Sequence, residues 1–132
     1  MTNAPHHDDR GRESPAARFD ATATSFDLAA ELASLRHEPS PARHGHRQKT
    51  LLKVAGRTIA LFSLDEGASL PEHAANGAVT VQPIEGELEV TVDGATSVLT
   101  PGQLLAMAPK VRHAVRARVP AAFLLQVSVA SG

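Results

Sequence analysis

The sequence has no cysteine, tryptophan or tyrosine, and its aromatic residues are four phenylalanines. Without cysteine there is no disulfide framework, no thiolate nucleophile and no sulfur ligand for zinc. A metal site in this chain must therefore use histidine, carboxylate or amide oxygen. Proteins that bind single-stranded nucleic acid stack bases on aromatic faces, and four scattered phenylalanines supply no such platform. The hydrophobic core is expected to be aliphatic.

The chain also lacks an excess of one charge and any long hydrophobic run. Thirteen Lys and Arg residues face fourteen Asp and Glu residues, so the formal net charge is -1. No positive field attracts phosphates or anionic lipid, and we expect neither nucleic acid nor a membrane as a partner. No window reaches the length of a membrane span, and the first ten residues lack the apolar core of a signal peptide. We expect a cytoplasmic protein.

Composition divides the chain into three parts. Residues 1–24 are rich in Asp, Arg, Ala, Ser, Thr and Pro and offer little to bury, so we expect a disordered tail in which His6 and His7 have no role. Residues 25–48 are expected to form a short helix and a linker. Residues 49–132 are expected to form a β domain.

Apolar residues recur at helical spacing after Ser25, which predicts a helix over 26–36 with Ser25 as its N-cap. Its apolar face is expected to pack on the β domain or across a dimer. Residues 37–48 contain two prolines and a glycine, which predict a linker. His44 and His46 lie in this segment and are expected to face water.

From Thr50 onward, short β-prone runs alternate with turn residues, as in an antiparallel sandwich or barrel. Asp93-Gly94 is the clearest hairpin turn, because Asp-Gly suits the positive dihedral angles of a two-residue connection. The predicted strands are 50–54, 57–64, 78–84, 87–92, 96–99, 104–107, 112–118 and 121–129.

One stretch has the spacing of the first motif of the cupin superfamily, which runs Gly, five residues, His, one residue, His, three or four residues, Glu, six residues, Gly. Gly67, His73 and Gly86 are in register with this motif, but Ala75 replaces the second histidine and Val79 replaces the glutamate. In the second cupin motif only the first glycine and the histidine match, at Gly102 and His113. The chain therefore resembles a small bacterial cupin-2 protein with incomplete metal motifs.

The resemblance implies a single RmlC-like, jelly-roll-like β-barrel, in an all-β fold preceded by the tail and the helix. It also implies that His73 and His113 point into the barrel from neighbouring strands, where a cupin holds a divalent metal such as Fe, Mn, Zn or Ni. Gln82 is a candidate third ligand, whereas strand alternation turns Glu72 away if His73 points inward. Arg112, Arg116 and Arg118 alternate with His113 and are expected to face outward, as a solvated face or a partner surface.

Two histidines leave the role of the site open. Catalytic metal sites usually present about three protein ligands, so a metal here is expected to be loosely held, and the two imidazoles can instead form a hydrogen-bonding pair in an aliphatic cavity. The leading hypothesis is a protein that binds a small molecule or a loose divalent metal inside the barrel through His73, Gln82 and His113. The alternatives are a metal-dependent oxygenase or isomerase and a dimeric regulatory or scaffolding subunit. No catalytic residue is identified, and a homodimer is expected.

Overall fold

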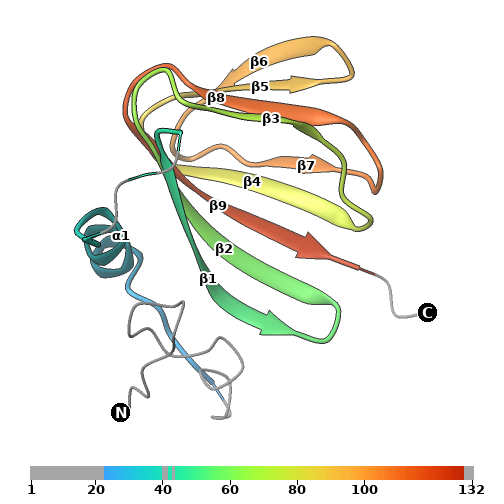
Figure 1. Cartoon of the computed structure of the whole chain (residues 1–132). Helices are drawn as coiled ribbons and strands as arrows, with labels where there is room; N and C mark the ends of the chain where they lie inside the picture. The colour runs from blue at the N-terminus through green and yellow to red at the C-terminus, as the bar shows by residue number, and fades with distance from the viewer. Residues whose placement is uncertain (1–22, 40–41, 43, 130–132) are drawn as a thin grey trace.

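A computed structural model describes residues 23–39, 42 and 44–129, so residues 1–22 of the predicted tail lie outside the described part. Nine strands form two antiparallel sheets that face each other, and one helix lies outside them (Figure 1). The elements are α1 (Leu28–Arg36), β1 (His46–Val54), β2 (Arg57–Leu64), β3 (Ser69–His73), β4 (Ala78–Glu85), β5 (Leu88–Val92), β6 (Ala95–Leu99), β7 (Leu105–Met107), β8 (His113–Ala117) and β9 (Ala121–Ser128).

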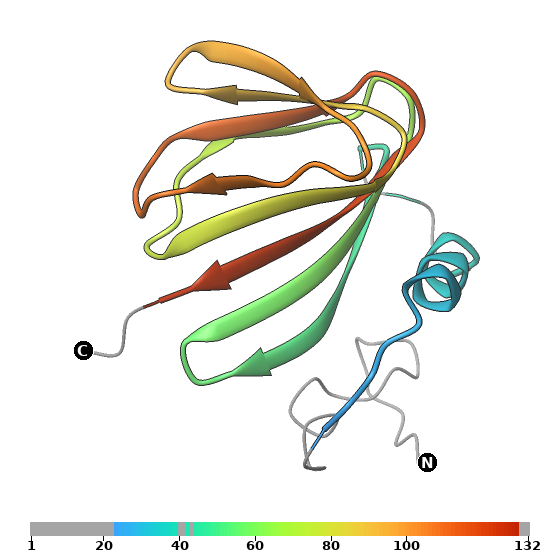
Figure 2. The same cartoon turned by 180° about the vertical axis from the view of Figure 1, so that it is seen from behind.

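The strand order defines the architecture. One sheet runs β1-β2-β9-β4-β7 and the other runs β3-β8-β5-β6. The last strand, β9, lies in the middle of the five-stranded sheet, and β8 lies inside the four-stranded one (Figure 2). The sequence-based prediction of an all-β, jelly-roll-like fold is confirmed, in the form of two sheets packed face to face.

The hydrophobic residues form two clusters, one on each side of the five-stranded sheet. The larger cluster fills the space between the sheets and is mainly aliphatic, as expected. At its centre the rings of Phe62 and Phe123 stack with centroids 4.9 Å apart and 4° between their planes. The smaller cluster lies under α1, where Leu32 and Leu35 pack against Leu51 and Leu61. Side chains of the five-stranded sheet therefore alternate between the interior and the helix.

Helix α1 forms within the predicted range 26–36 but begins two residues later, at Leu28, and its N-cap differs. The carboxylate of Asp27, and not Ser25, caps the helix by accepting a hydrogen bond from the backbone N–H of Ala30 at 3.1 Å. Two ion pairs tie the helix to the sheet: Glu31 Oε1 lies 2.5 Å from Nζ of the buried Lys49, and Arg36 pairs with Glu85 at 2.8 Å. Because the described chain holds only this nine-residue helix, no described helix could span a membrane.

One strand boundary and one additional strand differ from the sequence-based prediction in ways that concern the site. Strand β1 begins at His46, so His46 belongs to the sheet and not to the predicted linker. Strand β3 was not predicted, because Pro71 removes a hydrogen-bond donor and the run lacks alternation. The structure tolerates Pro71 because β3 is an edge strand, paired only with β8.

The hairpin turn at Asp93-Gly94 has the conformation that the sequence predicts. Asp93 has φ 48° and Gly94 has φ 83°, and Val92 pairs with Ala95 across the turn. These two positive angles define the two-residue hairpin that Asp-Gly predicts.

Candidate functional site

Strands β3 and β8 bring His73 and His113 together. The two residues are direct cross-strand partners, although forty positions separate them in the chain. Their ring centroids lie 4.3 Å apart with 60° between the planes. His113 is 2% exposed, whereas His73 is exposed at the end of its edge strand. The expectation that both histidines come from neighbouring strands is confirmed.

Both rings are held in the same tautomer by the backbone. Nδ1 of His73 lies 3.1 Å from the carbonyl oxygen of Pro71, and Nδ1 of His113 lies 3.1 Å from that of Val111. A carbonyl oxygen only accepts, so each Nδ1 must carry the proton. In the neutral rings each Nε2 then has a free lone pair, which can accept a hydrogen bond or bind a metal.

A pocket of about 330 Å³ contains the histidine pair. The two stacked phenylalanines form part of its wall, and His46 and Gln48 on β1 contribute further polar groups. Three of its lining residues, Gln48, Pro71 and His73, are exposed. The lining residues are His46, Gln48, Phe62, Leu70, Pro71, His73, His113, Val115, Phe123 and Leu125. None of these side chains is Lys, Arg, Asp or Glu, so the pocket is mainly apolar with a few hydrogen-bonding groups.

Gln82 does not lie with the two histidines. It is exposed on β4 and pairs with Leu124, which packs against the cluster under α1. Its neighbours Val79 and Val81 occupy the interior face instead. Alternation along β4 therefore places Gln82 on the helix side of the sheet, and it is not among the residues that line the pocket.

The residues present fit a tight metal centre poorly. Among the residues that the structure describes, no three His, Cys, Asp or Glu side chains lie close enough together to hold a metal ion. Val79 stands on the interior face where the family motif has its glutamate. Two imidazoles in the correct tautomer suit a loosely held divalent ion whose other ligands are water, but not a three-ligand centre.

His46 and Gln48 were missed as pocket residues by the sequence analysis. They pair with Leu64 and Phe62 of β2, whose side chains belong to the interior cluster. Register with β2 thus turns positions 46 and 48 inward and turns Lys49 toward the helix. The run His46-Arg47-Gln48-Lys49-Thr50 is polar throughout, so no apolar alternation marked an inward face, and the glycine and prolines before it predicted a linker.

The outward positions around the site are occupied by ion pairs. Glu72 turns away from the pocket, as predicted, and its carboxylate lies 3.0 Å from Arg112. Arg116 pairs with Glu89 at 3.5 Å, and Arg118 lies 3.7–3.8 Å from Glu89 and Glu87. The predicted arginine stripe therefore faces outward and is paired with carboxylates.

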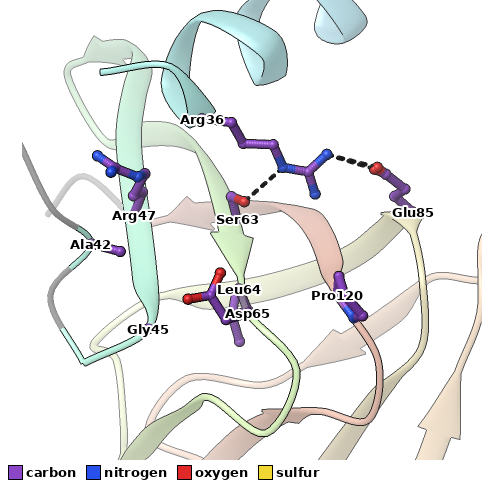
Figure 3. Close-up of a pocket in the computed structure, with 9 residues that line it drawn as sticks. All are labelled: Arg36, Ala42, Gly45, Arg47, Ser63, Leu64, Asp65, Glu85 and Pro120. Atoms are coloured by element: carbon purple, nitrogen blue, oxygen red, sulfur yellow. Dashed lines mark hydrogen bonds and ion pairs between the residues drawn. The ribbon is translucent and has the colours of Figure 1, made fainter. Parts of the chain in front are cut away.

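A second, larger hollow lies where α1 meets the sheet (Figure 3). Arg36 crosses it, donating from Nε to the Ser63 hydroxyl at 3.0 Å and from Nη1 to both oxygens of Glu85 at 2.8 and 2.9 Å. The guanidinium is thereby neutralised and anchored. Arg36 thus anchors the end of the helix to the sheet. This hollow shares no lining residue with the histidine pocket.

The fold and the site together define a small jelly-roll protein with an internal pocket. Residues 60–127 match the model of the Cupin_2 family, described as "Cupin domain". The match covers more than half of the chain, and the chain belongs to the cupin domain family. No curated protein matches it.

Several solved structures are similar. A conserved protein of unknown function from Streptococcus pyogenes is 26% identical, with a TM-score of 0.68 over 85% of this chain and 92% of that chain. An RmlC-like cupin from Shewanella frigidimarina is 26% identical, with a TM-score of 0.63 over 67% and 79%. The cupin_2 domain of an XRE family transcriptional regulator from Enterobacter cloacae is 26% identical, with a TM-score of 0.60 over 66% and 99%.

Proposed function

We propose that this cupin binds a small, mostly apolar molecule in the 330 Å³ pocket, with His73 and His113 as its polar contacts. The supporting observation is the composition of the pocket wall, which joins an apolar surface to two imidazoles of fixed tautomer. Such a wall is typical of sites where apolar contacts supply affinity and a few polar groups set orientation.

The binding proposal is tested by filling the pocket from its edge. Leu70 lines the pocket from the edge strand β3 and is only partly buried, so tryptophan can replace it without disturbing the centre of the core. In an NMR titration with 1-octanol, methyl resonances of Val115 and Leu125 are expected to shift in the unmodified protein. Leu70→Trp is expected to weaken this binding at least about tenfold, a loss of roughly 1.4 kcal/mol.

Leu104→Trp is the matched control, because Leu104 is 60% exposed and does not line the pocket. It should leave the octanol affinity unchanged. Equal effects of the two substitutions, or shifts confined to residues outside the pocket, would contradict the proposal.

A divalent metal is the second component to test, because the two Nε2 lone pairs can hold one loosely. Tag-free protein is expected to retain clearly less than one equivalent of Zn²⁺, Mn²⁺ or Ni²⁺ after exhaustive dialysis, since two protein ligands give weak binding. Residual binding should disappear in the double variant His73→Ala, His113→Ala and persist in His37→Gln, which changes an exposed helix-terminal histidine. Elemental analysis measures all three proteins. Stoichiometric metal lost only in the double variant would instead favour the metal-dependent oxygenase or isomerase.

A further inference from the structure

Four strands form the edges of the two described sheets, and β6 differs from the other three. An edge strand exposes backbone N–H and C=O groups to which a strand of another chain can add. The other edges carry features that oppose such addition: β1 has Arg47, Lys53 and a register shift, β3 has Pro71 and a register shift, and β7 spans three residues. Strand β6 contains neither a charged residue nor proline, and it pairs with β5 over all five residues without a shift.

The backbone of β6 has two residues that face away from its sheet. Directly after β5, the N–H of Asp93 donates to the carbonyl oxygen of Arg112, beside β8, at 3.3 Å. Because hydrogen-bonded pairs alternate along an antiparallel ladder, odd-numbered positions of β5 bond to β8 and even-numbered positions bond to β6. Ser97 pairs with an even-numbered position of β5, so its backbone groups point toward β5. The N–H and C=O groups of Thr96 and Val98 therefore point outward from the edge.

The side chains along this edge are uncharged as well. Residues 94–109 contain no Lys, Arg, Asp or Glu. Val98 is 41% exposed, and in both views its strand is the outermost one of the four-stranded sheet (Figures 1 and 2). Residues 94–109 therefore do not repel an incoming uncharged strand, and covering the exposed valine would remove apolar surface from water.

A second copy of the same edge is a matching occupant, because β6 is complementary to itself. If two copies run antiparallel around a two-fold axis at Ser97, Thr96 of each copy lies opposite Val98 of the other. These are the residues whose backbone groups point outward, so each of these pairs can exchange both of its backbone hydrogen bonds. Ser97 then meets its own copy and Ala95 lies opposite Leu99, so no like charges are brought together. An interface of this symmetry closes as a dimer.

We propose that two copies of the chain pair through β6 in this register and join their four-stranded sheets edge to edge. Strand β6 does not line the histidine pocket, so the proposal stands apart from the proposed function. The pairing covers a single short strand on each copy, which is less surface than a stable dimer buries. The dimer is therefore expected to dissociate with a constant between about 1 µM and 1 mM.

Val98→Lys is the first test. It places an ammonium group on the edge of each copy, which is how many natural edge strands avoid pairing. The substitution is expected to raise the dissociation constant of the dimer at least about tenfold. Val119→Lys is the matched control, because Val119 is 39% exposed, lies between β8 and β9 and gives the variant the same net charge. Sedimentation equilibrium of each full chain measures the constant.

The register is tested by a double variant, Thr96→Glu with Val98→Lys. In the proposed register the introduced carboxylate of each copy lies opposite the introduced ammonium group of the other. Such pairs are expected to restore dimerisation at least about threefold relative to Val98→Lys alone. The double variant Val98→Lys with Val119→Glu has the same net charge and should not restore it.

Three results would overturn the proposal. The first is an unmodified chain that stays monomeric up to about 1 mM, where the expected dimer is well populated. The second is an equal dissociation constant for Val98→Lys and Val119→Lys, which would place a dimer contact elsewhere. The third is equal behaviour of the two double variants, which would refute the register around Ser97. The pocket is tested separately by the octanol titration, so the proposed function stands or fails independently.

Discussion

Gly86→Ala is expected to destabilise the protein by about 2–4 kcal/mol, because two costs add at this position. Gly86 has φ 78°, a region that alanine adopts only with strain. In addition, a Cβ at Gly86 would lie 2.3 Å from the carbonyl oxygen of Pro120 and 2.8 Å from Cα of Ala121. Backbone atoms cannot rotate away as a side chain does, so the turn before β5 and the start of β9 must separate. Urea unfolding measures the loss.

Gly102→Ala is the matched control for that experiment. Gly102 has φ 96°, but a Cβ there would meet no atom within 4 Å. Its expected cost is about 1–2 kcal/mol, that of the backbone conformation alone. Equal losses at the two glycines would show that the close approach to Pro120 does not contribute. Gly86 belongs to the first cupin motif and Gly102 is the matching glycine of the second, but the structure requires glycine at the two positions for different physical reasons.

Phe123→Ala is expected to cost about 3–5 kcal/mol, the usual range for removing a large buried aromatic side chain. Phe123 is 1% exposed and lies on β9, between β2 and β4. Its removal deletes the offset stack with Phe62 and leaves a cavity that joins the pocket beside the histidine pair. Thermal and chemical unfolding should both show the loss.

Leu104→Ala provides the comparison, since its side chain is 60% exposed. Its expected effect lies within about 0.5 kcal/mol of zero. If Phe123→Ala cost no more than Leu104→Ala, the two sheets would not share the core described above.

The sequence predicted the parts of the fold that local rules determine. Asp93-Gly94 specified its hairpin because few residue pairs suit two positive φ angles. The apolar spacing over 26–36 predicted the helix. The N-cap is Asp27 and not the predicted Ser25, because the carboxylate of Asp27 accepts a hydrogen bond from the N–H of Ala30. The motif spacing brought His73 and His113 together correctly.

Two of the remaining features depend on pairing that no local rule contains. Strand β3 holds a proline, and only its place at the edge of a sheet makes that acceptable. The inward direction of His46 is set by its register with Leu64. The position of Gln82 could have been read from the sequence, because Val79 and Val81 alternate with it and mark the interior face of the same strand.

The ion pairs on the outer face of the four-stranded sheet have a kinetic consequence. Three arginines there, Arg112, Arg116 and Arg118, lie close to three glutamates, Glu72, Glu87 and Glu89. Opposite charges at such short range cancel within about a Debye length, so this face projects little field toward an approaching molecule. A charged molecule that approaches this face is therefore neither strongly attracted nor repelled, and its rate of encounter there is expected to depend little on ionic strength.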